Sequence, residues 1–399
     1  MANPLDPTPS TPAAAAPAPL AGVKVIDLSR VLAGPLCTMV LADLGADVVK
    51  IERPVEGDDT RHWGPPFAGE DAAYFLSLNR NKRSATADLG SPEGVSLVRR
   101  LASTADVLIE NFRPGLMARF GLSLHDLREA NPRLVTCSLT AFGGDAQETA
   151  SRPGYDIIVQ ALSGLMSVTG EPDGEPTKAG VALLDVITGL FAAVGVLAAL
   201  HERDETGRGR QVGVALFDAS VAAMVNQAAN YLIGGVVPER MGTAHPNIVP
   251  YQSFHASDRP FILAAGNDRL FARTCEVVGH ASWADDPRFA TNEARVIHRD
   301  ELIPLLAEEF ARRSMHGWLT MLERAGVPCA PIMSFDEVFA SSDGAGLVER
   351  IEDPVRGLLR LVASPIRFDG VVPPTRTPPP LLGQHDAEVR RNLEDGTQP

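Results

Sequence analysis

The chain has 399 residues, of which 45% are hydrophobic and 22% are charged, a composition typical of a globular protein and a length that favours two domains. Its net charge of -14 argues against nucleic acid or an anionic membrane as a partner of the surface as a whole. Four cysteines (Cys37, Cys137, Cys275 and Cys329) are scattered without a CxxC pair. We therefore expect reduced, buried thiols and no metal site.

Residues 1–20 are rich in proline and alanine, but they contain neither a basic region nor a continuous apolar segment. This composition is typical of a disordered tail and not of a signal peptide. We expect no apolar run to reach the roughly 18 residues that span a bilayer. The sequence therefore predicts a cytoplasmic protein without a transmembrane helix.

Strands and helices alternate in the first part of the chain. The predicted strands are 23–28, 47–52, 106–110 and 134–139, and the predicted helices are 34–44, 92–102 and 124–130. Ser91 followed by Pro92 is a helix-start signal. The alternation predicts parallel strands and a doubly wound, Rossmann-like α/β domain. No GxGxxG motif follows the first strand, so a nicotinamide cofactor is not expected.

A single carboxylate, Asp185, interrupts the apolar run 179–189, just before a predicted helix at 186–203. Free backbone N–H groups at a helix start favour an anion, so the position alone favours an N-cap. A desolvated aspartate can also act as the nucleophile of covalent catalysis. Position alone leaves both interpretations open.

Composition changes in the second half of the chain. The predicted elements are a strand at 211–217, a helix at 218–232, a loop at 245–251, a strand at 261–265 and helices at 268–278, 299–312 and 315–325. They indicate a smaller α+β domain. The proline-rich stretch 372–380 predicts an extended strap over another surface.

Five segments in this order resemble the class III CoA-transferases, the family of formyl-CoA transferase, carnitine CoA-transferase and the α-methylacyl-CoA racemases. They are LAGP at 32–35, LGADVVKIERP at 44–54, NRNKRS at 79–84, DVLIENFRPG at 106–115 and GRGRQV at 207–212. The resemblance runs from about residue 20 to 384. It implies an interlocked homodimer whose large domain takes residues from both chain ends. The implied ranges are 1–20 for the tail, 21–230 for the large domain, 231–335 for the small domain and 336–399 for a return segment completing the large domain.

The resemblance also reverses the interpretation of Asp185. In the family the nucleophilic aspartate follows a Gly-x-Asp/Glu segment at the spacing seen here after Gly154-Tyr155-Asp156. Coenzyme A would contact the residues Arg30, Val31, Leu32, Arg53, Asn111, Phe112 and Arg119. Lys82, Arg83 and Arg113 add to a local supply of cations for its phosphates. No tightly bound cofactor is implied, because the CoA thioester is a substrate.

Tyr155 distinguishes two activities within the family. The racemases carry histidine at this position, and histidine titrates near neutrality, whereas tyrosine has a reference pKa near 10. Tyr155 therefore favours a transferase, with Tyr155 and Asp156 near the substrate carboxylates. A racemase or epimerase is the second hypothesis, and a CoA-binding homologue without catalysis is the third.

The loop 242–251 replaces the glycine-rich loop of oxalate-handling relatives. It resembles the dicarboxylate members of the family instead, such as the glutarate and citramalate-type transferases that use succinyl-CoA. His245 is a candidate for contact with the acceptor carboxylate, and a solvent-facing loop histidine is the alternative.

Overall fold

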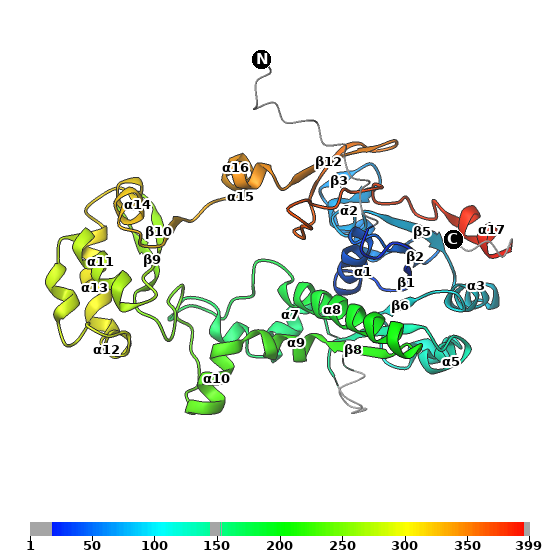
Figure 1. Ribbon diagram of the computed structural model, residues 1–399, viewed down its shortest axis with the longest axis horizontal. Helices are drawn as coiled ribbons and strands as arrows, with labels where there is room; N and C mark the ends of the chain where they lie inside the picture. Colours follow the sequence, from blue (N-terminus) through cyan, green and yellow to red (C-terminus); the bar gives the residue numbers. More distant parts are fainter. Residues whose placement is uncertain (1–17, 144–151, 153, 395–399) are drawn as a thin grey trace, which may run out of the picture. The chain divides into compact units, whose positions relative to one another are not determined.

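The computed structural model describes residues 18–143, 152 and 154–394 (Figure 1). Most of the expected N-terminal tail, residues 1–17, lies outside this range. The chain divides into two compact units, one from 1–155, 184–219 and 347–399 and the other from 156–183 and 220–346. The domain ranges expected from the sequence stay predictions, because compactness alone does not show that a unit folds independently.

A parallel sheet of six strands organises the first unit, in the order β5-β2-β1-β6-β7-β8. The strands are β1 (Lys24–Asp27), β2 (Asp47–Glu52), β5 (Lys82–Thr86), β6 (Val107–Glu110), β7 (Val135–Thr140) and β8 (Gln211–Ala215). The chain runs outward from β1 to β2 and β5, and then returns to β6 on the other side of β1. The strand order therefore reverses between β1 and β6, where open α/β sheets bind their ligands.

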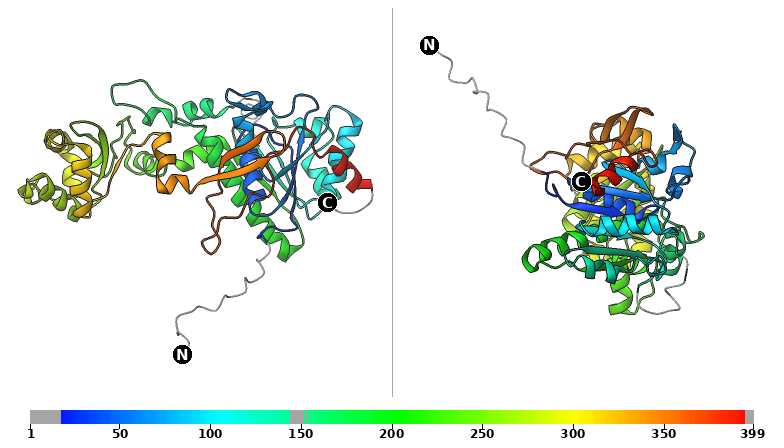
Figure 2. Two further views of the ribbon diagram at one scale, coloured as in Figure 1. Left: turned by 90° about the horizontal axis from the view of Figure 1, so that it is seen from above. Right: turned by 90° about the vertical axis from the view of Figure 1, so that its right-hand side faces the viewer.

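Helices cover both faces of this sheet (Figures 1 and 2). On one face, α1 (Ala33–Asp43) and α8 (Leu183–Thr206) pack against alternate strand residues such as Val25 and Val107. On the other face, α3 (Pro92–Ala102), α5 (Leu124–Ala130) and α17 (Asp386–Glu394) pack against the neighbouring residues, such as Ile26 and Leu108. The expected doubly wound α/β class is confirmed, and the C-terminal helix belongs to the same unit as the N-terminal strands.

Local signals placed several helices correctly. Ser91 accepts a hydrogen bond from the N–H of Gly94 at the start of α3, as expected of an N-cap. The helix expected at 218–232 is instead two, α9 (Leu216–Ala223) and α10 (Val225–Gly234). Val225 has φ of 33°, a value outside the right-handed helical region, so the helix is interrupted there.

The short elements of the first unit complete its edges. They are η1 (Asp59–His62), β3 (Phe67–Ala68), β4 (Asp71–Ala72), α2 (Ala73–Leu76), α4 (Leu116–Arg119), β12 (Val348–Asp353) and β13 (Gly357–Val362). Ion pairs tie the return segment to them. Arg356 pairs with Asp353 and with Asp71, and Asp71 also pairs with Arg61 at 2.7 Å.

The second unit is built around an antiparallel sheet of order β11-β10-β9. Its strands are β9 (Tyr251–His255), β10 (Pro260–Ala264) and β11 (Cys329–Pro331), and its main helices are α11 (Asp268–Val278), α13 (Arg299–Phe310) and α14 (Met315–Arg324). Its further elements are α7 (Asp156–Leu162), η2 (Met166–Val168), η3 (Ala281–Asp285), α12 (Asn292–Ile297), α15 (Phe335–Ala340) and α16 (Ser342–Ala345). An aromatic cluster of Phe254, Phe261, Phe310 and Trp318 fills the core.

Helix α8 corrects one expectation. The helix has 24 residues and contains an 18-residue window with a mean hydropathy of 2.3, so by length and composition it could cross a membrane, contrary to the expectation that no run of this length occurs. Residues four apart, such as Ala192, Val196 and Leu200, are buried in the core that the parallel sheet shares with α1. This face of the helix is apolar because it packs in the core of the first unit, whereas Leu190, Phe191 and Val194 are exposed.

All four cysteines are free, and Cys37, Cys137 and Cys275 are buried, whereas Cys329 is partly exposed. Burial raises the pKa of the Cys137 thiol to about 12. These thiols therefore stay protonated and unreactive at neutral pH.

Candidate active site

The ends of β1 and β6 meet where the strand order reverses. The side chain of Asn111, directly after β6, accepts a hydrogen bond from the Arg30 N–H at 2.9 Å and donates one to the Arg30 carbonyl at 2.8 Å. This reciprocal pair joins the loop after β1 to the loop after β6. Asn111 therefore has a structural reason to be an asparagine, because only an amide both donates and accepts in this way.

Phe112 is held by the buried end of β6. Its N–H donates to the Glu110 carboxylate at 2.8 Å, and the Ser138 hydroxyl donates to the other oxygen of Glu110. Burial raises the pKa of Glu110, against the lowering effect of these hydrogen bonds. The Phe112 ring packs edge-to-face on Phe120, and the Arg30 guanidinium lies 5.6 Å from its centre.

Asp185 lies in the first turn of α8 and is half-buried. It is the third residue of the helix, so the N-cap position falls before it and the simple capping interpretation does not apply. One turn later, Gly189 lies against α1: a β-carbon there would be 2.6 Å from the Ala33 carbonyl oxygen. This close approach places the start of α8 beside the loop that follows β1.

Eight of the residues expected at the site line one pocket of about 250 Å³ in the first unit. They are Arg30, Val31, Leu32, Asn111, Phe112, Arg113, Tyr155 and Asp185. The side chain of Tyr155 is 65% exposed, so it has room to meet a ligand. The pocket thus combines a carboxylate in the first turn of a helix, a backbone loop and two residues from the end of β6.

A second pocket of about 330 Å³ shares Arg30 and Phe112 with the first. It is lined by apolar residues such as Ile51 and Phe120, and also by the charged residues Lys50, Arg53 and Asp58. Asp59 pairs with both guanidinium groups, at 2.7 Å from Arg53 and 3.4 Å from Arg30. Two arginines beside an apolar cavity are suited to a ligand that has both a flat ring and phosphate groups, because the guanidinium groups can bind the phosphates and the cavity can hold the ring.

The remaining expected residues lie elsewhere. Arg119 is exposed at the end of α4 and lines neither pocket. Asp156 and His245 belong to the second unit, where Asp156 is buried and bonded by the amide of Gln160. Lys82 is wholly buried and donates to Asp27, Pro35 and Asn79, so it is not available to bind a phosphate from solvent.

His245 has a defined hydrogen-bonding state. Its Nδ1 accepts from the N–H of Asn247 at 3.0 Å, and its ring packs against Tyr251. Burial and the nearby Arg299 lower the pKa of His245. The imidazole is therefore neutral at pH 7 and carries its proton on Nε2. Its neighbours in the loop, Ala244, Pro246 and Asn247, line a crevice of about 1360 Å³ within the second unit.

Sequence inspection missed a buried group of charges beneath the loop after β1. Lys50 and Asp58 have fully buried side chains and pair at 2.9 Å, and Asp27 binds Lys82 at 3.2 Å. Charged residues in strands that are otherwise apolar, such as Lys50 within DVVKIE, were the available signal. Strand alternation alone could not show that their side chains converge.

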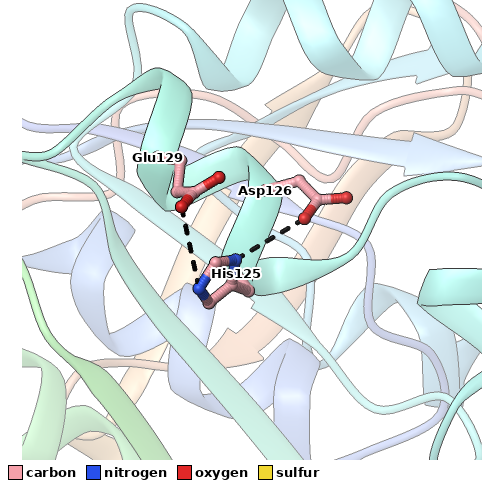
Figure 3. A group of neighbouring side chains, drawn as sticks. All are labelled: His125, Asp126 and Glu129. Carbon is pink, nitrogen blue, oxygen red and sulfur yellow. Dashed lines mark ion pairs between the residues drawn. The ribbon is translucent and has the colours of Figure 1, made fainter.

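One group of three potential metal ligands occurs among the residues that the structure describes: His125, Asp126 and Glu129 (Figure 3). His125 lies 3.6 Å from Asp126 and 3.9 Å from Glu129. All three are exposed on α5, and such exposed pairs are common without an ion. They are interpreted as solvated surface charges.

Comparison with known proteins identifies the class. The sequence profile of CoA-transferase family III matches residues 20–386, and the chain belongs to that family. It is 46% identical over 384 residues to the succinate–glutarate CoA-transferase of Agrobacterium fabrum, covering 94% of this chain and 96% of that one. It is 42% identical over 377 residues to the succinyl-CoA:glutarate CoA-transferase of Mus musculus, covering 94% and 86%. The crystal structure of a CAIB/BAIF family protein from Brucella suis has a TM-score of 0.82 and 44% identity, covering 95% and 100%.

Proposed function

We propose that this enzyme moves coenzyme A from succinyl-CoA to a free dicarboxylic acid, with Asp185 as the nucleophile. The observation that carries the proposal is the shared pocket, in which Asp185 lies with the loop 30–32, Asn111, Phe112 and Tyr155. Relatives named for succinate and glutarate support the substrate class. The CoA thioester is a substrate of the family, and it needs no further cofactor in this reaction.

The reaction follows from carboxylate chemistry at Asp185. The Asp185 carboxylate attacks the thioester carbon of succinyl-CoA, which forms a mixed anhydride and releases the CoA thiolate. The thiolate attacks the Asp185 carbonyl carbon, which releases succinate and leaves an aspartyl-CoA thioester. The acceptor carboxylate attacks that thioester and again releases the thiolate. The thiolate then attacks the acceptor's acyl carbon, which gives the new acyl-CoA and restores the Asp185 carboxylate.

Both pockets of the first unit contribute to the proposed CoA site. Arg30, Val31, Leu32, Asn111 and Phe112 line the pocket of Asp185, where the thioester end would react. The apolar second pocket, which also contains Arg53, suits the adenine. The phosphates would replace Asp59 as the partner of the two arginines. Arg119 is proposed only as an outer contact, because it is exposed.

Tyr155, Asp156 and His245 are proposed to bind the acceptor acid. Tyr155 offers a hydroxyl group beside Asp185, and the Nε2–H of His245 can donate to a second carboxylate. Asp156 directly follows Tyr155 and lies in the first turn of α7. The loop 242–251 is proposed to select a dicarboxylate. An interlocked homodimer in the cytoplasm completes the proposal, and exposed apolar side chains on α10, such as Leu232 and Ile233, are available for such an interface.

An oxygen-18 experiment tests the proposal directly. The purified enzyme is incubated with succinyl-CoA and glutarate labelled with ¹⁸O in its carboxylates, and the CoA products and free acids are followed by mass spectrometry. Each turnover should move one ¹⁸O from glutarate to Asp185. Because either carboxylate oxygen of Asp185 can attack the next succinyl-CoA, the label should enter succinate over the following turnovers. Glutaryl-CoA formed without label in succinate would exclude the covalent Asp185 route.

A second incubation tests the racemase hypothesis. In deuterated water without an acceptor acid, a transferase leaves the α-hydrogen of a chiral 2-methylacyl-CoA in place. A racemase exchanges it. Exchange by the wild-type enzyme without any acceptor would contradict the proposed function.

A further inference from the structure

Val31 has a backbone conformation that its side chain disfavours. Its φ is 70°, in the left-handed region that β-branched residues rarely occupy. The residue lies in the loop between β1 and α1 and lines the pocket that contains Asp185. A costly conformation of this kind persists only where the surrounding structure imposes it, and such residues cluster at functional sites.

Side chains from other segments hold the backbone of residues 29–31. The Asn111 amide binds both polar backbone groups of Arg30. The Asp27 carboxylate accepts from the Ser29 N–H at 2.9 Å, and Lys50 Nζ donates to the Ser29 carbonyl at 2.8 Å. The Asp58 carboxylate accepts from the Val31 N–H at 3.3 Å. Side-chain contacts therefore fix the backbone on both sides of Arg30, just before the turn at residues 31–32.

Lys50 and Asp58 connect these contacts into one unit. Lys50 Nζ lies 2.9 Å from the Asp58 carboxylate, and both side chains are fully buried. Asp58 also accepts from the N–H of Thr60 at 3.0 Å and from its hydroxyl at 2.8 Å, which fixes the carboxylate. The Lys50 ammonium of this ion pair donates a hydrogen bond to the Ser29 carbonyl, and the Asp58 carboxylate accepts one from the Val31 N–H.

A buried ion pair is a poor source of stability, because the loss of hydration offsets the attraction between the charges. Packed apolar residues of similar volume would stabilise this interior at least as well. The pair does supply something that apolar residues cannot, which is two directed contacts to the backbone on either side of Arg30. Compared with apolar residues in the same place, the pair therefore adds a defined geometry and no net stability.

We propose that Lys50 and Asp58 are positioning residues for CoA transfer. Their ion pair holds Val31 in the left-handed conformation and keeps the loop 29–31 preformed beside Asp185. The CoA thioester therefore binds against a rigid backbone. This inference rests on the proposed function, since it gives the loop its role in binding CoA. Neither residue lines the pocket of Asp185, whereas both lie along the second pocket of the first unit. Their side chains are fully buried, and their contacts to the backbone of Ser29 and Val31 connect them to the pocket of Asp185.

The loop itself provides the first test. Hydrogen exchange of the peptide 28–36 is measured by mass spectrometry in the wild-type enzyme and in Asp58→Ala without substrate. We expect faster exchange in Asp58→Ala. The matched control is Asp353→Ala, because Asp353 also pairs with a buried cation, Arg356, and accepts two backbone N–H groups. Exchange in 28–36 should not change in this control.

Kinetics provide the second test. Loss of loop geometry should lower kcat/KM for succinyl-CoA by about tenfold to a hundredfold in Asp58→Ala, and leave the Asp353→Ala value near wild type. Adding Val31→Gly to Asp58→Ala should recover roughly threefold or more, because glycine adopts positive φ without a steric cost. If Asp58 only stabilised the fold, Val31→Gly would not restore kcat/KM in Asp58→Ala.

A third variant removes the risk of misfolding. Lys50→Met combined with Asp58→Leu leaves no unpaired buried charge and should fold with a melting temperature near wild type, yet keep the kinetic defect. Wild-type kcat/KM in this folded variant, or unchanged exchange in Asp58→Ala, would overturn the inference. Failure of the proposed function would look different, because Asp185→Asn would then retain transfer whatever the loop variants do.

Discussion

Gly189 of α8 lies against the Ala33 carbonyl oxygen so closely that a β-carbon at position 189 would be 2.6 Å from it. Gly189 is one helical turn after Asp185, and Ala33 begins α1 directly after the loop 30–32. The contact therefore sets the separation between the proposed nucleophile and the proposed CoA loop. A side chain at position 189 must move one of the two helices.

Gly189→Ala should lower both stability and activity. The methyl group would force α8 away from α1, at a cost of about 1–3 kcal/mol in the free energy of unfolding. A displacement of about 1 Å at Asp185 can reduce kcat by as much as a hundredfold. Urea denaturation and steady-state transfer from succinyl-CoA measure the two effects. Gly213→Ala is the control, since nothing lies within 4 Å of a β-carbon there. Equal losses of unfolding free energy and of transfer activity in Gly189→Ala and Gly213→Ala would contradict the steric argument.

Asp185→Asn should abolish transfer and leave the fold intact. The substitution preserves the volume of the side chain and removes the nucleophilic oxygen. Circular dichroism and the melting temperature report the fold, and mass spectrometry of the CoA products reports turnover. Activity within about tenfold of wild type, or roughly 1.4 kcal/mol of barrier, would exclude Asp185 as the nucleophile.

Asn111→Asp should weaken CoA binding more than it slows the chemical step. A carboxylate can still accept from the Arg30 N–H, but it cannot donate to the Arg30 carbonyl, which Asn111 does at 2.8 Å. Leaving that carbonyl without its donor costs about 1–3 kcal/mol. We expect KM for succinyl-CoA to rise by about tenfold, with a smaller change in kcat. A fall in kcat at constant KM would show that Asn111 acts on the reaction and not on the loop.

Asp58 should give the unfolding free energy a defined acid dependence. Burial alone would raise the pKa of Asp58, but Lys50 and the bonds from Thr60 lower it to about 2, from an ordinary 3.8. Because the folded-state pKa is depressed, this carboxylate contributes stability that is complete above about pH 4 and is lost as the pH falls towards 2. The shift corresponds to about 2 kcal/mol.

Urea denaturation of wild type and Asp58→Asn between pH 5 and pH 2 measures this contribution. The two unfolding free energies should differ most at pH 5, and the difference should narrow by about 2 kcal/mol as the pH approaches 2. A difference that stays constant over this range would show that Asp58 is not ionised in the folded enzyme.

His245→Ala should reduce the preference for a dicarboxylate acceptor. Neutral His245 has its Nδ1 occupied by Asn247, so its Nε2–H can donate to a distal carboxylate. Loss of a hydrogen bond to a charged group costs about 1.5–3 kcal/mol, or roughly tenfold to a hundredfold in discrimination. The ratio of kcat/KM for glutarate and butyrate is the measurement. If both acceptors lose activity together, His245 belongs to the catalytic machinery.

The sequence was sufficient to predict features that depend on a pattern within a single helix or strand. The alternating strands and helices predicted the doubly wound sheet, and strand 47–52 and helices 92–102 and 124–130 have the predicted bounds. The isolated charge of Asp185 in an apolar run marked it for attention, and the family segments added its role. Such features depend on neighbours along the chain, where hydrophobic period and capping residues act directly.

The tertiary structure decided which distant side chains meet. It buried Lys82, which the sequence had placed among the cations available to phosphate, and it left Arg119 on the surface. It brought Lys50 and Asp58 together beneath Val31, although nothing in their spacing requires it. Periodicity shows which face of a strand is buried, but the partner of a buried charge depends on the three-dimensional packing of other segments.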